Sequence, residues 1–208
     1  GVNASTVAED VYNAISAGQK TSDAVAFVEK ATMLAKGGFA ETGQALDVLT
    51  TILNAYGMES SKTEEISNML ITTQNRGKVT VAELSSVMGK VIPTANANNV
   101  ALEQLCAGYS IMTARGIAAA ETTTYMNSML NELSKSGSTT DKLLRQKMGG
   151  SFAELMASGK SLGEILGGIQ EEANKSGLAL SDMFSSSEAG KAAMSLLSNG
   201  VDGFNSSV

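Results

Sequence analysis

The residues that could do chemistry in this chain are few, and their spacing does not favour catalysis. Carboxylates occur as two adjacent pairs, Glu64-Glu65 and Glu171-Glu172, and adjacent positions on a helix do not converge on one point. The single thiol, Cys106, lies on the apolar face of an expected helix, and the chain has no histidine to activate it. We therefore predict solvated carboxylates and a buried packing role for the cysteine.

A small basic cluster is formed by Lys142, Arg145 and Lys147. It is more typical of a solvated helix face than of a phosphate site, and it is too small for a nucleic-acid surface. The absence of histidine also removes the commonest imidazole metal ligand and the commonest general base. The sequence therefore predicts no catalytic, no cofactor-binding and no metal-binding residues.

The composition is that of a chain with a real core. Of its 208 residues 43% are hydrophobic and 17% are charged, and the net charge is -6. The acidic balance argues against a nucleic-acid-binding surface. One cysteine cannot form an internal disulfide, which favours a reducing compartment. No apolar run approaches the roughly 18 residues that could span a bilayer. The start, GVNASTVAED, lacks a basic n-region and a methionine, so we expect no signal peptide and a piece of a longer protein.

Residues 80–116 predict a helix, a break and a second helix. Thr80 and Glu83 have the spacing of a capping box, and apolar residues then recur on one face. Pro93, the only proline, is expected to end or kink that helix because it has no N–H to donate. The polar run 94–99 is expected to cross the break, and Gly116 to end the second helix.

The rest of the chain repeats this pattern of capped helices that end at glycines. No segment alternates with period two, so we predict an all-α fold, a multi-helix bundle of about ten to twelve short helices. Capping boxes are expected at 6–9, 151–154 and 161–164. The first helix is expected to stop at Gly18. The remaining helices are expected at 21–36, 41–56, 61–76, 121–135, 140–148, 151–156, 161–176 and 188–197, with one turn at 181–184.

Four glycines fall inside these helical patterns: Gly108, Gly163, Gly167 and Gly168. Glycine destabilises a helix interior, so we interpret them as places of close backbone packing or of a bend. Gly163 and Gly167 have the spacing of a small-xxx-small packing face. The eleven methionines fit either gap-filling core positions or an adaptable interaction surface.

Short matches between the two halves indicate an internal repeat. The tetrapeptide TVAE occurs at 6–9 and again at 80–83, and AET occurs at 40–42 and 120–122. They predict a helical core at 1–150 made of two stacked four-helix repeats, 5–77 and 79–149, followed by a small C-terminal helical segment at 151–208. Chance matching of alanine-rich helices is the alternative.

Four segments in order carry a resemblance to a known family. They are ALDVLTTILNAYG at 45–57, VTVAELSSVMGKVIPTA at 79–95, VALEQLCAGYSIMTARGI at 100–117, and FAEL at 152–155 with FSSSEAGKAA at 184–193. Each is weak alone, but their order and spacing resemble the core region of phage tail tape measure proteins over nearly the whole chain.

The resemblance implies a virion structural protein without enzymatic activity and without cofactors. It implies a role in setting tail length, in tail assembly and in DNA ejection. The implied partners are the tail tube, tail tip and assembly chaperone proteins, with self-association also open and no specific nucleic-acid binding. It places the chain in the virion tail, assembled in the host cytoplasm. A cell-wall hydrolase and a membrane-active or cell-wall-penetrating helical module of a tail stay open as alternatives. Membrane contact during ejection is not favoured by the composition of this region.

Overall fold

The computed structural model describes residues 4–16 and 21–208, which form helices and no strand. The predicted all-α fold is confirmed. The chain forms two compact units, the first from residues up to 75 together with 79–89, and the second from 76–78 together with 90–208. Within the described ranges, no helix is both long enough and apolar enough to cross a membrane.

The first unit packs around α3. Its helices are α1 (Ala4–Ser16), α2 (Thr21–Gly37), α3 (Thr42–Ala55), α4 (Thr63–Arg76, of which the last residue belongs to the second unit) and α5 (Val81–Val87), with a 3-10 turn at Ser60–Lys62. Helix α3 contacts α1, α2 and α5. Its apolar residues recur every three or four positions, so one face is buried: Leu46, Leu49, Ile52 and Leu53. Glu41 and Gln44 begin the helix with a reciprocal capping box.

One side chain holds three elements of this unit together. The Gln74 amide donates to the carbonyl of Gly37 at 2.9 Å and accepts from the N–H of Val81 at 2.8 Å. Both groups lie at helix ends, where no partner within the helix is available. The glutamine therefore ties the C-terminal end of α2 to α4 and to the start of α5.

The expected break at Pro93 is wrong in its position. Helix α5 ends at Val87 and is followed by a 3-10 turn at Met88–Lys90. Pro93 lies in the first turn of a further helix, α6 (Ile92–Ala97), where the missing N–H would have no partner in the helix anyway. The polar run is therefore helical up to residue 97, and the break comes at Asn99, whose φ is +60°.

Three of the four predicted capping boxes are confirmed, those that begin at Thr80, Ser151 and Ser161. The box at 6–9 is wrong because α1 already begins at Ala4, which leaves Thr6 inside the helix. The expected stop at Gly18 lies outside the described residues. A last short helix, at 200–206, was not predicted from the sequence.

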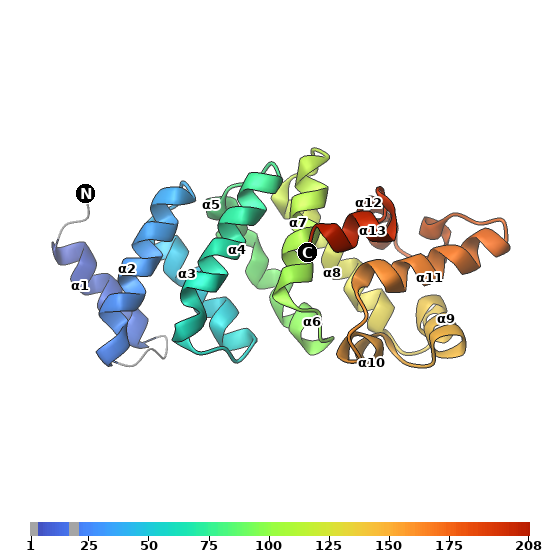
Figure 1. Cartoon of the computed structure of the whole chain (residues 1–208), viewed down its shortest axis with the longest axis horizontal. Coiled ribbons are helices and arrows are strands. Elements are labelled where there is room, and N and C mark those ends of the chain that lie inside the picture. The colour runs from blue at the N-terminus through green and yellow to red at the C-terminus, as the bar shows by residue number, and fades with distance from the viewer. Residues whose placement is uncertain (1–3, 17–20) are drawn as a thin grey trace. The chain divides into compact units, whose positions relative to one another are not determined.

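The second unit is built on α8 and α12, which lie side by side (Figure 1). Its helices after α6 are α7 (Leu102–Ala114), α8 (Ala119–Ser134), α9 (Thr139–Met148), α10 (Phe152–Ala157), α11 (Leu162–Lys175), α12 (Ser187–Leu196) and α13 (Gly200–Ser206), with a 3-10 turn at Leu180–Met183. Helix α7 packs on both α8 and α12. A Cβ on Gly108 of α7 would meet Met126 Sδ at 2.6 Å, so this glycine lets the helices approach closely.

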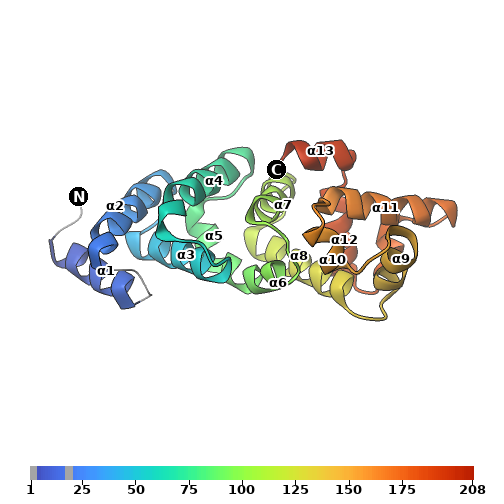
Figure 2. The ribbon, with the colours of Figure 1, turned by 60° about the horizontal axis from the view of Figure 1, so that its bottom comes forward.

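The remaining helices of this unit gather around α11, which contacts α9, α10 and α13 (Figure 2). A Cβ on Gly163 would lie 2.9 Å from Phe204 of α13, and one on Gly167 would lie 2.5 Å from Val201. One on Gly168 would lie 3.0 Å from Met148 Sδ of α9. The predicted close packing at these glycines is confirmed, and α13 is what covers the first two.

The second unit contains residues 90–150 and 151–208 together. The division of the chain at residue 150, and the two repeats at 5–77 and 79–149, stay predictions.

Candidate functional site

The structure places Cys106 in the interior of the second unit. Its side chain is on α7, and the residue is 4% exposed. A reactive thiol needs an electropositive and partly exposed setting. The predicted packing role of this cysteine is confirmed by its burial.

The carboxylate pairs lie on helices, and three of their four carboxylates have a lysine partner. In the pair at 64–65, which lies in the first turn of α4, Glu65 is 3.4 Å from Lys62 Nζ. Both carboxylates of the pair at 171–172 contact Lys175, at 3.7 and 3.3 Å. A hydrogen bond from the ammonium to Glu172 and the negative charges nearby raise the pKa of Lys175 above its ordinary value. Neither pair brings two carboxyl groups to face one another across a cleft.

Two cations of the basic cluster form ion pairs with carboxylates. Arg145 Nε donates to Asp141 Oδ1 at 3.0 Å, and Lys147 Nζ lies 3.9 Å from Glu172 Oε2. Lys142 is exposed. Two of the three cations therefore face acidic side chains, which agrees with a solvated helix face.

Asp141 is a structural carboxylate. It is 3% exposed and accepts from the N–H of Gly137 at 2.9 Å, just before α9 begins. This hydrogen bond, followed by those from Arg145, holds the pKa of Asp141 below its ordinary value. A carboxylate kept ionised by such bonds stabilises a turn and is unsuited to proton transfer near neutral pH.

A buried polar pair connects α7 and α8. Tyr109 is fully buried, and its hydroxyl lies 2.5 Å from Thr123 Oγ1. Thr123 Oγ1 donates to the carbonyl of Ala119, so the tyrosine must donate in the pair. Burial raises the pKa of Tyr109 far above its ordinary value, so it is a neutral donor and not a base.

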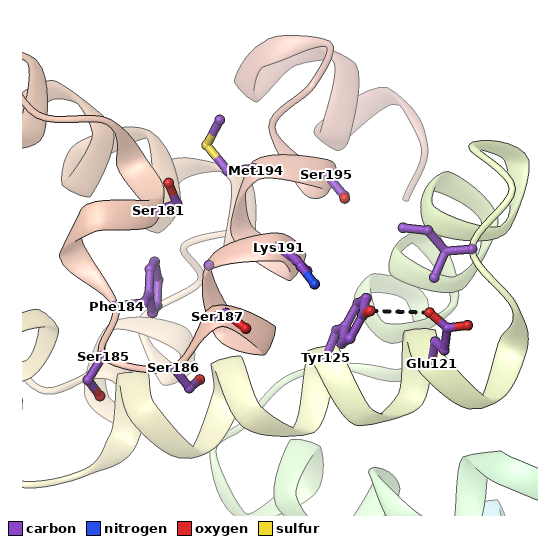
Figure 3. A pocket seen from close by; sticks show the side chains of 12 residues that line it. Glu121, Tyr125, Ser181, Phe184, Ser185, Ser186, Ser187, Lys191, Met194 and Ser195 are labelled. Atoms are coloured by element: carbon purple, nitrogen blue, oxygen red, sulfur yellow. Dashed lines mark hydrogen bonds between the residues drawn. The ribbon is translucent and has the colours of Figure 1, made fainter.

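A groove with a volume of about 720 Å³ lies between α8 and α12 in the second unit (Figure 3). Its apolar lining comes from Ile117, Tyr125, Phe184 and Met194. Tyr125 donates to Glu121 Oε2 at 3.1 Å. Lys191 Nζ lies 5.5 Å from the centre of the Tyr125 ring, within the range of a cation–π contact.

Five serines line this groove, at positions 181, 185, 186, 187 and 195. Ser186 Oγ accepts from the N–H of Ala189 and so begins α12. Ser185 donates from both its N–H and its hydroxyl to Glu132 Oε1. These serines hold the loop before α12 in place, and the sequence alone did not single out this groove.

The comparisons with known proteins give the chain a family. The family model described as "Phage-related minor tail protein" matches residues 1–197. The chain belongs to this family. The resemblance found in the sequence is therefore confirmed, and both compact units lie mainly within the matched part.

A curated relative is similar to most of this chain, a member of the minor tail family. It is named "Probable tape measure protein" and comes from Clostridium phage phiCD119; it is 38% identical over 206 residues, which cover 94% of this chain and 22% of the relative. The chain thus spans about a fifth of the relative. No solved structure matches the chain. Among the described residues of this family member, no group of three or more acidic or cysteine side chains could hold a metal ion.

Proposed function

We propose that this chain is a structural region of a tape measure protein in a phage or prophage tail, where the whole protein sets tail length and assists tail assembly and DNA ejection. The observation that carries the proposal is the 38% identity to a tape measure protein over nearly the whole chain. The family match over residues 1–197 supports the same role.

A non-enzymatic role fits the chemistry of the side chains. The thiol is buried, and the paired carboxylates contact lysines or solvent. The serines of the α8–α12 groove are used in a helix cap and in a loop contact. The side chains therefore contribute packing and surface, which is what an assembly protein needs.

The tail tube, the tail tip and an assembly chaperone are the partners we propose, in a virion tail assembled in the host cytoplasm. Each compact unit buries its own core. A bundle of packed helices is too wide to lie unchanged inside a narrow tube, so this region either rearranges on assembly or lies near one end of the tail. Density for extended helices inside the tube of mature tails would support the first arrangement, and globular density at the tip would support the second.

The test is an in-frame deletion of the codons for residues 1–208 in a phage that carries this chain. We expect assembly to fail or tail length to lose its control, measured by negative-stain electron microscopy of lysates. Complementation in trans with the intact gene is the control and should restore uniform tails. Virions with tails of normal length and normal plating efficiency after the deletion would overturn the proposal.

A further inference from the structure

A groove in the first unit lies between α2 and α4, away from the features described above. Helix α2 lines it with a stripe at helical spacing: Asp23, Phe27, Lys30, Met33 and Leu34. Positions three or four apart lie on one face of a helix. The stripe covers three turns, so the groove extends along most of α2.

Helix α4 faces this stripe with one of its own: Glu64, Ser67, Asn68 and Ile71. The two helices run in the same direction, with both N-terminal ends at one end of the groove (Figure 1). Two hollows of about 470 and 300 Å³ follow one another along it and share Lys30. Two parallel helices with facing stripes form a site into which a third helix can lay one of its faces.

The two ends of the groove differ in what lines them. At one end the Gln74 side chain bonds to Gly37, and a Cβ on Gly37 would lie 3.3 Å from Ile71. At the other end, where both helices begin, the lining comes from Met58 and the turn that precedes α4.

The part of the groove that lies directly between α2 and α4 has a mainly apolar lining, which includes Met33, Leu34 and Ile71, whereas the hollow beside residues 53–61 is more polar. Phe27 and Leu34 are buried beneath it, whereas Met33 is 73% exposed. Methionine adapts its shape to a partner and is frequent at such surfaces. The Ser67 hydroxyl is shielded from solvent and has no hydrogen-bond partner in the described part of the chain, so it can accept or donate one more bond.

The rims of the groove are acidic. Asp23, Glu59 and Glu64 line them, against the single cation Lys30. Within the described ranges none of these four groups is in a salt bridge. Asp23 and Glu64 lie in first turns of helices, where a negative charge is stabilised by the helix dipole. They place negative charge at the end of the groove where both helices begin.

We propose that the α2–α4 groove binds a basic amphipathic helix of another protein, with apolar residues on one face and lysines or arginines beside it. The mainly apolar part between α2 and α4 takes the apolar face, and the rim carboxylates meet the basic flank, as charge complementarity requires. A second copy of this chain is a poorer occupant because its net charge of -6 opposes the acidic rim. The inference rests on the proposed assembly role only in placing the partner among tail components.

The test uses the whole 208-residue chain and two synthetic helical peptides of about 14 residues, a length that matches three to four turns of the groove. Both peptides carry leucines at i, i+3, i+4 and i+7; one has lysines on its polar flank and the other has glutamates. Binding is measured by fluorescence anisotropy. We expect the lysine peptide to bind at least about tenfold more tightly than the glutamate peptide.

Variants assign that binding to the groove. In Asp23→Lys/Glu64→Lys the preference between the peptides should reverse, while Glu29→Lys, the same charge change at an exposed position of α2 outside the groove, should leave it unchanged. Met33→Ser should weaken both peptides without touching the core. Far-UV circular dichroism checks that each variant is folded.

Equal affinity for the two peptides, no binding of either at millimolar concentration, or the same loss in Glu29→Lys would each overturn the proposal. A homodimer in sedimentation that Met33→Ser abolishes would instead assign the groove to a second copy. Peptide binding in vitro together with normal tails in the deletion phage would support the groove as a binding site and reject the assembly role. Failure of the groove proposal can therefore be told apart from failure of the proposed function.

Discussion

Gly167 of α11 lowers the stability of its helix but allows α13 to pack closely. Replacing Gly167 with alanine should change both effects, in opposite directions. A Cβ at this position would lie 2.5 Å from Val201 Cγ2 on α13. Valine is stiff about χ1 because it is branched at Cβ, so the methyl group cannot turn away without strain. The alanine therefore pushes α13 from α11.

The magnitude follows from two opposing effects. Alanine in place of glycine inside a helix stabilises it by about 1 kcal/mol. Overpacking a core contact costs about 1–3 kcal/mol, so Gly167→Ala should lower the free energy of unfolding by up to about 2 kcal/mol. In a Val201→Ala background the nearest atom of residue 201 is its Cβ, 4.0 Å away, which is ordinary van der Waals contact. There Gly167→Ala should raise the free energy by up to about 1 kcal/mol.

The assay is a double-mutant cycle on four chains, unfolded in urea and followed by far-UV circular dichroism. Hydrogen exchange measured by mass spectrometry should place the loss of protection in α11 and α13, which matters because the two compact units need not unfold together. Gly43→Ala is the matched control, since a Cβ there would meet nothing within 4 Å. A Gly167→Ala effect of the same sign in both backgrounds would refute the reasoning.

Three further predictions concern single groups. Thr123→Val should lower the free energy of unfolding by about 1–3 kcal/mol because it strands the buried hydroxyl of Tyr109, whereas Tyr109→Phe should cost about 0.5–1.5 kcal/mol; urea denaturation of both variants checks this order. The Gly137 N–H holds the pKa of Asp141 below its ordinary 3.8, so the carboxylate stabilises the fold above that pH and loses this contribution as the pH falls below it. Asp141→Asn should therefore flatten the loss of stability in an acid titration. Phe39 is 77% exposed and has a φ of +56°, a conformation that strains any side chain with a Cβ. Phe39→Gly should therefore raise the free energy of unfolding by up to about 1 kcal/mol, which a thermal melt detects as a higher melting temperature. Phe39→Ala keeps the Cβ and should not raise it.

Much of the local structure was predictable because its determinants lie within one helical turn. The boxes that begin at Thr80, Ser151 and Ser161 form as predicted, since each needs only a hydroxyl and a carboxylate three residues apart. The same local reading failed at Pro93, because a proline is equally suited to ending one helix and to beginning the next. It also failed at Thr6, where α1 starts two residues before the expected cap.

The family was also within reach of the sequence. Ordered short segments carried the resemblance, and the family match over residues 1–197 confirms it. A chain without histidine and with one cysteine on an apolar helix face leaves few routes to catalysis. The burial of Cys106 then follows from the face on which it lies.

By itself the sequence determined that the chain is helical, where most helices begin, and that four glycines inside helices need a close neighbour. Only the tertiary structure decided what those neighbours are. Gly163 and Gly167 predict a close contact, but no residue near them in the sequence indicates that α13 is the helix that makes it. Likewise the stripes on α2 and α4 each read as ordinary helix faces, and they become a groove only because the two helices lie parallel and are joined at one end by Gln74. Capping and propensity act over three or four residues, whereas the pairing of helices depends on side chains that are far apart in the chain and meet only in the fold.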